Sequence, residues 1–358
     1  MPSGQSPVDI EDLRTRVEKE IETFLEAQQP LLDGVSEDVL PMLDAARALL
    51  AGGKRMRPAF AYWGWRGAGG IDGPEIVPAV AALEFLQACA LIHDDVMDGS
   101  DTRRGQPSVH RRFAGLHRTA RWSGSAESFG AGAAILLGDL ALTWADQMLY
   151  SAPLPYARLQ AAKPVYDRMR SELMAGQYLD LLEQVRGGGS VERALRVARY
   201  KSAKYTVEAP LHLGGVLAGA SPNLLATYTA YGVPLGEAFQ LRDDVLGVFG
   251  DPEVTGKPAG DDLREGKRTV LIAVAEEHGS HSQRAALNRH LGDPRLDAAG
   301  VQELRALITE TGALAHVEDL IATRLAEART ALRDVAEIEE PAAVVLESLA
   351  DATTRRAG

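Results

Sequence analysis

The chain has 358 residues, of which 46% are hydrophobic, which is enough apolar material for one large domain or two ordinary ones. Its formal net charge of −12 argues against a nucleic-acid backbone as a partner. The single cysteine, Cys89, excludes a disulfide framework. Because the first residues also lack the order of a signal peptide, we expect a cytoplasmic protein without an integral membrane segment.

Apolar residues recur at helical spacing along most of the chain. The predicted helices cover residues 9–26, 39–50, 76–92, 133–150, 164–184, 191–208, 235–244 and most of 270–350. No strand-type alternation and no internal repeat is evident. We therefore predict an all-α fold, with residues 1–358 forming a single domain of roughly a dozen helices.

Three segments fall outside this helical pattern. Residues 1–8 and 352–358 are expected to fray at the ends. Residues 113–129 are rich in glycine, serine and charge, and we predict a long loop there. Such a loop serves as a lid or a partner contact, or it is plainly disordered.

The most informative stretch is the end of the apolar run at residues 76–92. It leads directly into Asp94, Asp95 and Asp98, which are followed by Arg103 and Arg104. At helical spacing Asp94 and Asp98 lie on one face, and carboxylates 4 Å apart repel by about 4 kcal/mol at intermediate dielectric. Such a cluster is tolerable if it is solvated, partly protonated or holds a cation. Hard oxygen ligands beside basic residues indicate magnesium and a phosphate-bearing substrate. Most acidic sequence patterns of this kind, however, belong to solvated helix faces.

A second apolar helix ends in a similar way. Asp243 and Asp244 follow it, with Gln240 one turn earlier, and a loop rich in glycine, proline and charge comes next. A basic stretch, GGKRMRP at residues 52–58, precedes both acidic motifs. Each feature alone is explained by surface charge. Together they predict a cavity in which magnesium ions and basic side chains bind a diphosphate and stabilise the charge on it as it leaves carbon.

The motifs GGKRMRP, LIHDDVMDGSDTRRG, YKS, GEAFQLRDDVLGVFGD and TGK occur in an order that resembles the trans-isoprenyl diphosphate synthase (polyprenyl synthetase) family. The similarity covers about Leu50 to Ala275. It implies a helical bundle around a deep central cavity, usually a homodimer. It also implies head-to-tail condensation of isopentenyl diphosphate with allylic diphosphates to an all-trans prenyl diphosphate. Magnesium is the expected cofactor, at about three ions per site, with manganese as a substitute.

The resemblance also assigns roles to individual residues. Metal binding falls to Asp94, Asp95, Asp98, Asp243 and Asp244. Contact with the allylic diphosphate falls to Arg103, Lys201, Ser202, Gln240, Lys257 and Lys267, and all of these except Ser202 and Lys267 are counted with the five aspartates as catalytic. The isopentenyl diphosphate pocket falls to Gly53, Lys54, Arg57, Gln87 and Arg104.

The chain departs from the family pattern at two residues, and its segment 113–129 is longer than the usual connection. Gly247 stands where many members have a third aspartate, and Asp251 is a candidate substitute. Ser202 replaces the more common threonine but keeps the hydroxyl. Because the implied chemistry needs no nucleophilic side chain or general base, His93 is expected to be structural.

The resemblance implies that product length depends on the helix that precedes the first acidic motif. Ala90 lies one turn before Asp94, with Cys89 beside it and Leu86 another turn away as a candidate floor. Small residues there leave room for a growing tail, so we predict geranylgeranyl diphosphate as the product. Close helix packing is the other explanation for them. The alternatives are a farnesyl or longer-chain synthase, a class I terpene cyclase, and a non-catalytic subunit of a heteromeric synthase.

Overall fold

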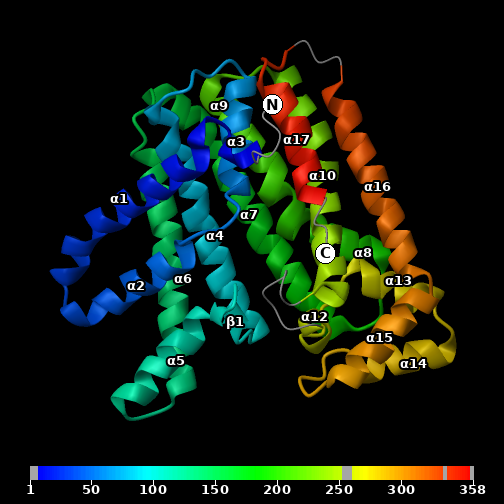
Figure 1. The fold of residues 1–358 in the computed structure, drawn as a ribbon. Helices are drawn as coiled ribbons and strands as arrows, with labels where there is room; N and C mark the ends of the chain where they lie inside the picture. The colour runs from blue at the N-terminus through cyan, green and yellow to red at the C-terminus, as the bar shows by residue number, and fades with distance from the viewer. Residues whose placement is uncertain (1–6, 252–259, 334–336, 355–358) are drawn as a thin grey trace. The chain divides into compact units, whose positions relative to one another are not determined.

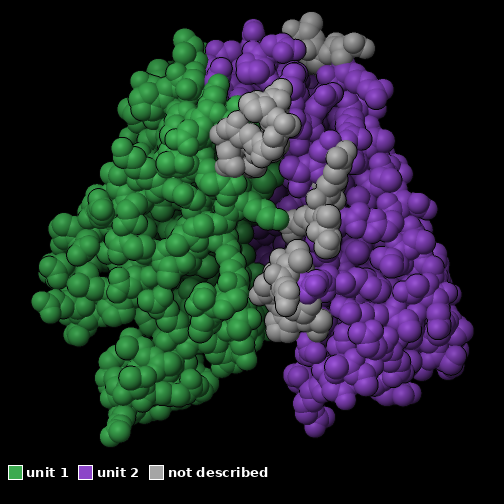
Figure 2. All heavy atoms as spheres, viewed as in Figure 1, with its two compact units in different colours: residues 1–62, 71–160 green, residues 63–70, 161–358 purple. Residues whose placement is uncertain are grey.

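The computed structural model describes residues 7–251, 260–333 and 337–354. Within these ranges the regular secondary structure is helical, apart from one antiparallel ladder of two-residue strands (Figure 1). This confirms the all-α prediction. The chain divides into two compact units, unit 1 with residues 1–62 and 71–160, and unit 2 with residues 63–70 and 161–358 (Figure 2). The prediction of a single domain stays a prediction.

Unit 1 is built around one apolar helix. Its elements are η1 (Pro7–Asp12), α1 (Leu13–Asp33), η2 (Glu37–Val39), α2 (Leu40–Leu50), η3 (Pro74–Ile76), α4 (Val77–Asp98), β1 (Thr102–Arg103), β2 (Gln106–Pro107), α5 (Val109–Ala120) and α6 (Ala126–Tyr150). The central helix is α4, which packs along α6, and its Phe85 ring lies 5.0 Å from Phe24 and 6.0 Å from Trp144 between centroids. This packing fixes the position of the acidic end of α4.

Two helices of unit 1 are long and apolar enough, by length and composition alone, to span a membrane. They are Pro74–Asp98, which contains α4, and Ala126–Tyr150, which is α6. In Pro74–Asp98, 72% of the 18-residue apolar segment is buried, as expected for the core helix of a folded unit. In α6 only 39% of the corresponding apolar segment is buried, so this helix keeps an exposed apolar face.

Residues 113–129 form a helical hairpin, which corrects the predicted long loop. The helix α5 continues to Ala120 and α6 begins at Ala126, where the Ser125 side chain accepts a hydrogen bond from the Ser128 backbone. The ring of Phe129 lies 5.6 Å from His117 and 5.3 Å from Trp122, between centroids. Gly130 permits the close packing of the two helices, because a Cβ there would lie 2.3 Å from the backbone oxygen of His110. Glycine serves here as a packing residue and not as a loop former.

Unit 2 contains the rest of the chain. Its elements are α8 (Val191–Val197), η4 (Ala198–Glu208), α9 (Ala209–Ala218), α10 (Pro222–Phe249), α12 (Asp261–Arg264), α13 (Val270–His278), α14 (His281–His290), α15 (Ala298–Glu310), α16 (Ala313–Leu332) and α17 (Ala342–Thr354). The helices α3 (Met56–Gly67) and α7 (Tyr156–Arg186) begin in unit 1 and end in unit 2. The long helix α10 packs against η4 and α16, and its buried side joins a core that includes Leu241, Val245 and Val248.

Candidate functional site

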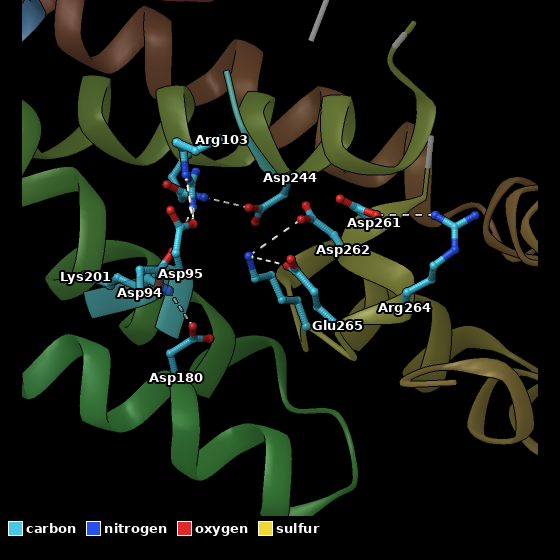
Figure 3. A network of polar contacts seen from close by, with 12 residues as sticks. Asp94, Asp95, Arg103, Asp180, Lys201, Asp244, Asp261, Asp262, Arg264 and Glu265 are labelled. Carbon is cyan, nitrogen blue, oxygen red and sulfur yellow. Dashed lines mark hydrogen bonds and ion pairs between the residues drawn. The ribbon is translucent and has the colours of Figure 1, made fainter. Parts of the chain in front are cut away.

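The first acidic motif lies at the last turn of α4. Asp95 is buried, Asp94 and Asp98 are partly buried, and the helix ends at Gly99, which adopts a left-handed conformation. Arg103 on β1 is paired with this motif (Figure 3). Its Nε donates to Asp95 Oδ1 at 2.9 Å, and its Nη2 contacts Asp95 and lies 3.6 Å from Asp94 Oδ2. A guanidinium group therefore partly neutralises the motif.

Arginines gather at the start of α3 and next to β1, also in unit 1. Gly53 has φ +103° and lets the Arg104 guanidinium approach, because a Cβ at residue 53 would lie 3.2 Å from Arg104 Nη2. Burial lowers the pKa of Arg104, and the nearby positive charges of Arg55, Arg103 and Arg57 act in the same direction, against Glu84. Closely spaced positive charges of this kind favour a bound anion.

Arg55 has a structural role in this basic stretch. It is buried, donates from Nη1 to Glu84 Oε2 at 2.5 Å and from Nη2 to the backbone oxygen of Leu50 at 2.6 Å. By contrast, Lys54 is exposed and Arg57 is partly exposed. Of the three basic residues, the latter two are therefore the accessible ones.

The second acidic motif lies near the end of α10 in unit 2. Asp243 is exposed, whereas Asp244 is buried and accepts a hydrogen bond of 2.7 Å from Gln240 Nε2. Burial raises the pKa of Asp244 to about 8, and the nearby carboxylates of Asp262, Asp243 and Asp180 raise it further against the effect of that hydrogen bond. Without a cation, this carboxyl group is therefore largely protonated at neutral pH.

Lys201 and Ser202 lie on η4, an eleven-residue π-helix. Glycines in the neighbouring helices allow this element to fit. A Cβ at Gly176 of α7 would lie 2.3 Å from the Lys201 backbone nitrogen, and one at Gly236 of α10 would lie 2.4 Å from the Ala203 backbone oxygen. Lys201 Nζ donates to Asp180 Oδ2 at 2.6 Å (Figure 3). Extended π-helical turns are rare and often mark functional sites.

The short helix α12 and the residues directly after it contribute further charged side chains. Lys267 Nζ lies 2.8 Å from Glu265 Oε2 and 3.7 Å from Asp262 Oδ1. Lys257, which was predicted to contact the allylic diphosphate, lies outside the described residues.

Sequence reasoning gave no role to Asp180, Asp262 or Glu265. A signal was present for Asp180, which is a lone acid between the apolar residues of a helix, in the segment YLDLL.

Each unit thus brings together part of the predicted site. Unit 1 holds Gly53, Lys54, Arg57, Gln87, Asp94, Asp95, Asp98, Arg103 and Arg104, whereas unit 2 holds Lys201, Ser202, Gln240, Asp243, Asp244 and Lys267. Over the described ranges, no three histidine, cysteine or carboxylate side chains are arranged closely enough to hold a metal. The donors themselves suit magnesium, because carboxylate oxygens are the hard ligands that this ion prefers.

The residues predicted to set product length differ in exposure. Leu86 and Cys89 are fully buried, whereas Ala90 is partly exposed. His93 Nε2 lies 3.1 Å from the backbone oxygen of Ile135, and its Nδ1 lies 3.7 Å from Cys89 Sγ. These contacts agree with the predicted structural role of His93.

These features define a class of protein: an all-α chain with two aspartate motifs, each at the end of an apolar helix and each beside paired cationic side chains. A family model described as polyprenyl synthetase matches residues 41–308, so the chain belongs to the polyprenyl synthetase family. It is therefore a trans-prenyltransferase that elongates prenyl chains, which confirms the enzyme class predicted from the sequence.

Individual relatives agree with this assignment. The chain is 30% identical to geranylfarnesyl diphosphate synthase of Aeropyrum pernix, over 86% of this chain and 91% of the relative. It is 32% identical to geranylgeranyl diphosphate synthase of Mycobacterium tuberculosis, over 86% and 81%. The solved structure of geranylgeranyl pyrophosphate synthase from Corynebacterium glutamicum, complexed with isoprenyl diphosphate and magnesium, superposes with a TM-score of 0.93 and 40% identity, covering 96% of this chain and 99% of that one.

Proposed function

We propose that the chain condenses isopentenyl diphosphate with allylic diphosphates and releases geranylgeranyl diphosphate. The observation that carries this proposal is the pair of aspartate motifs at the ends of α4 and α10. Each unit also supplies cationic side chains of the kind that a diphosphate requires, Arg103 in unit 1 and Lys201 and Lys267 in unit 2. The similarity to a geranylgeranyl pyrophosphate synthase that was crystallised with isoprenyl diphosphate and magnesium supports it.

Magnesium would be held by Asp94, Asp95 and Asp98 from unit 1 and by Asp243 and Asp244 from unit 2. When bound, magnesium supplies Lewis-acid stabilisation of the negative charge that develops on the departing diphosphate. We propose that both motifs act on the same diphosphate. The surroundings of Asp244 support magnesium binding at this motif. Burial and nearby carboxylates raise the pKa of its carboxyl group, and a bound divalent cation would stabilise the carboxylate against both effects.

The paired cationic side chains would exchange partners when substrate binds. Arg103 is paired with Asp95, Lys201 with Asp180 and Lys267 with Glu265. A metal on the first acidic motif would release Arg103 for a phosphate oxygen, so that the arginine always faces negative charge. Holding the cationic groups ready lowers the reorganisation needed when charge moves onto the leaving group. Gln240 would keep the Asp244 carboxylate in its orientation.

The isopentenyl diphosphate would bind to the arginine cluster of unit 1. Gly53 leaves space for the guanidinium of Arg104, and Lys54 and Arg57 extend the positive charge along the start of α3. Gln87 is one turn along α4 from Glu84, the partner of Arg55. This cluster argues against a terpene cyclase, which has no second diphosphate to bind.

Product length would be set on α4 before the first acidic motif. Because Ala90 keeps exposed surface whereas Cys89 and Leu86 are fully packed, Ala90 is the residue past which we propose the growing chain runs. The small side chain gives room for a tail longer than farnesyl.

We also infer a homodimer in the cytoplasm. On α6 the side chains of Phe129, Ile135 and Leu136 are 39%, 46% and 61% exposed, and a second copy of this chain would cover them. The cytoplasmic location rests on the single buried, unbridged cysteine. Leu136→Lys should reduce the mass that light scattering measures for the particle, and an unchanged mass would count against α6 as the contact.

The experiment that tests the proposed activity is incorporation of radiolabelled isopentenyl diphosphate. The protein is incubated with dimethylallyl, geranyl or farnesyl diphosphate and magnesium, and the products are dephosphorylated and sized by chromatography. We expect geranylgeraniol as the main product and no incorporation after chelation. A folded protein that incorporates no label with any primer or divalent metal would overturn the proposal.

A further inference from the structure

The π-helix η4, which carries Lys201, lies directly against the backbone of α10. A Cβ at Gly232 would lie 2.8 Å from Glu208 Cα, and one at Gly236 would lie 2.6 Å from Ala203 Cα. Because neither glycine has a side chain, the backbones of the two elements touch at both places. A displacement of η4 therefore has to break contacts with α10.

A charged contact lies further along the same two elements. Arg199 Nε donates to Glu237 Oε1 at 2.6 Å, and the Glu237 side chain is only 1% exposed. Lys201 is thus placed between two attachments of η4 to α10, the backbone contact at Ala203 and the ion pair at Arg199. On its other side, the Lys201 backbone nitrogen is in close contact with Gly176 of α7.

The buried carboxylate of Glu237 has a second cationic partner. Arg324 of α16 places its Nε 2.9 Å from Glu237 Oε2, and its Nη1 donates to Glu327 at 2.8 Å. A carboxylate this deeply buried needs partners of opposite charge, and here they come from two different elements. Glu237 therefore joins α10 both to η4 and to α16, and a change at one arginine breaks one link only.

The face of α10 that carries Glu237 leads to the second acidic motif. Glu237, Gln240 and Asp244 have the spacing i, i+3 and i+7, so they project from one side of the helix. Gln240 Nε2 donates to Asp244 Oδ1 at 2.7 Å. Across from this helix, Lys201 Nζ donates to Asp180 Oδ2 at 2.6 Å (Figure 3). The ion pair on Glu237 thus connects the element that carries Lys201 with the helix that carries Asp244.

We propose that the ion pair of Glu237 and Arg199 positions Lys201 for the allylic diphosphate. A π-helix of this length is rare, so the neighbouring elements must hold its shape. Glu237 and Arg199 are positioning residues in this account, and neither has to touch the substrate. The inference rests on the proposed function, in which Lys201 binds the allylic diphosphate, and it adds the residues that hold this lysine in place.

The test compares the two arginines in the radiolabel assay. Arg199→Gln should lower kcat/KM for the allylic diphosphate about tenfold, because a displacement of about 1 Å in a positioned group costs roughly a hundredfold. The KM for isopentenyl diphosphate should not change. Arg324→Gln, the matched control, removes the other partner of the same carboxylate and should keep the wild-type kcat/KM.

Stability separates positioning from a general structural role. The Arg199 side chain is 45% exposed, and Glu237 keeps Arg324 when Arg199 is changed. Arg199→Gln should therefore melt within about 2 °C of the wild type while it loses activity. A loss of activity that appears only with a much larger drop in melting temperature would overturn the proposal.

A double-mutant cycle with Lys201→Ala tests the route of the effect. If Arg199 acts through Lys201, Arg199→Gln should lower kcat/KM little further once Lys201 is alanine. A further loss as large as in the wild-type background, or equal losses for Arg199→Gln and Arg324→Gln, would overturn the assignment. Wild-type kinetics for Arg199→Gln would overturn this inference alone, whereas a wild type that incorporates no label would overturn the proposed function together with it.

Discussion

Asp244→Asn should stabilise the metal-free protein, and the gain should grow with pH. Burial and nearby carboxylates raise the pKa of Asp244 from 3.8 to about 8, so the native state keeps a proton that the unfolded chain releases. Stability therefore falls as pH rises between these two values and levels off above the higher one. Asparagine resembles the protonated carboxyl, still accepts from Gln240 and does not titrate.

The magnitude follows from the size of the shift. At pH 7.5 the difference from the ordinary value of 3.8 corresponds to a cost on the order of 5 kcal/mol, at about 1.36 kcal/mol per pH unit. An unfolding entropy of about 2.1 cal/mol/K per residue gives about 0.75 kcal/mol/K for 358 residues. The variant should therefore melt about 7 °C above the wild type at pH 7.5 and only about 2 °C above it at pH 5.

The assay is thermal unfolding followed by circular dichroism in the presence of a chelator from pH 5 to 8.5. Asp243→Asn is the matched control, because the adjacent Asp243 is exposed and its neutralisation should change the melting temperature little. Addition of magnesium and diphosphate should reverse the order, since the wild type gains more stability from the bound ligand than a variant that has lost one metal-binding carboxylate. A melting-temperature difference that stays constant with pH, or a variant less stable than the wild type at pH 7.5, would refute the reasoning.

The remaining predictions concern other parts of the chain. Ala90→Phe should shorten the product by at least one isoprene unit in the radiolabel assay, whereas Cys89→Phe should mainly destabilise a packed interior by about 1–3 kcal/mol in denaturant titration; equal product lengths for Ala90→Phe and the wild type would refute this. Glu84→Gln should cost up to about 3–5 kcal/mol, because it removes the closest carboxylate from the buried Arg55 and leaves only Glu18 at 3.7 Å, and a change within error would contradict the structural role of the pair. Gly236→Ala should lower the melting temperature and reduce activity together, because the new Cβ meets the backbone of η4, and an unaltered variant would show that this close contact does not exist.

The sequence predicted the helical fold and the acidic motifs because both depend on local pattern. The spacing of apolar residues identified α4, and the aspartates directly after that run were placed at its end. The hairpin of α5 and α6 was mistaken for a loop, since Gly130 looks like a loop residue until its close contact with the backbone of His110 is known.

The parts of the site that sequence reasoning missed depend on tertiary contacts. Arg199 and Glu237 are 38 residues apart, and nothing in the order of residues shows that their side chains are paired. Asp180 and Lys201 are paired across two helices in the same way. The structure was also needed to distinguish the role of Arg55 from the roles of Lys54 and Arg57, because only the burial of Arg55 beside Glu84 shows that it is structural.

The central claim is that two aspartate motifs act on one diphosphate through divalent cations. The most direct measurement is a crystal structure with Mn²⁺ and a non-reactive thio analogue of an allylic diphosphate, with the metal located by anomalous scattering. We predict anomalous peaks beside both Asp94 and Asp244 and a single diphosphate that contacts the metals of both motifs. Metal at only one motif, or a separate diphosphate at each, would contradict the account.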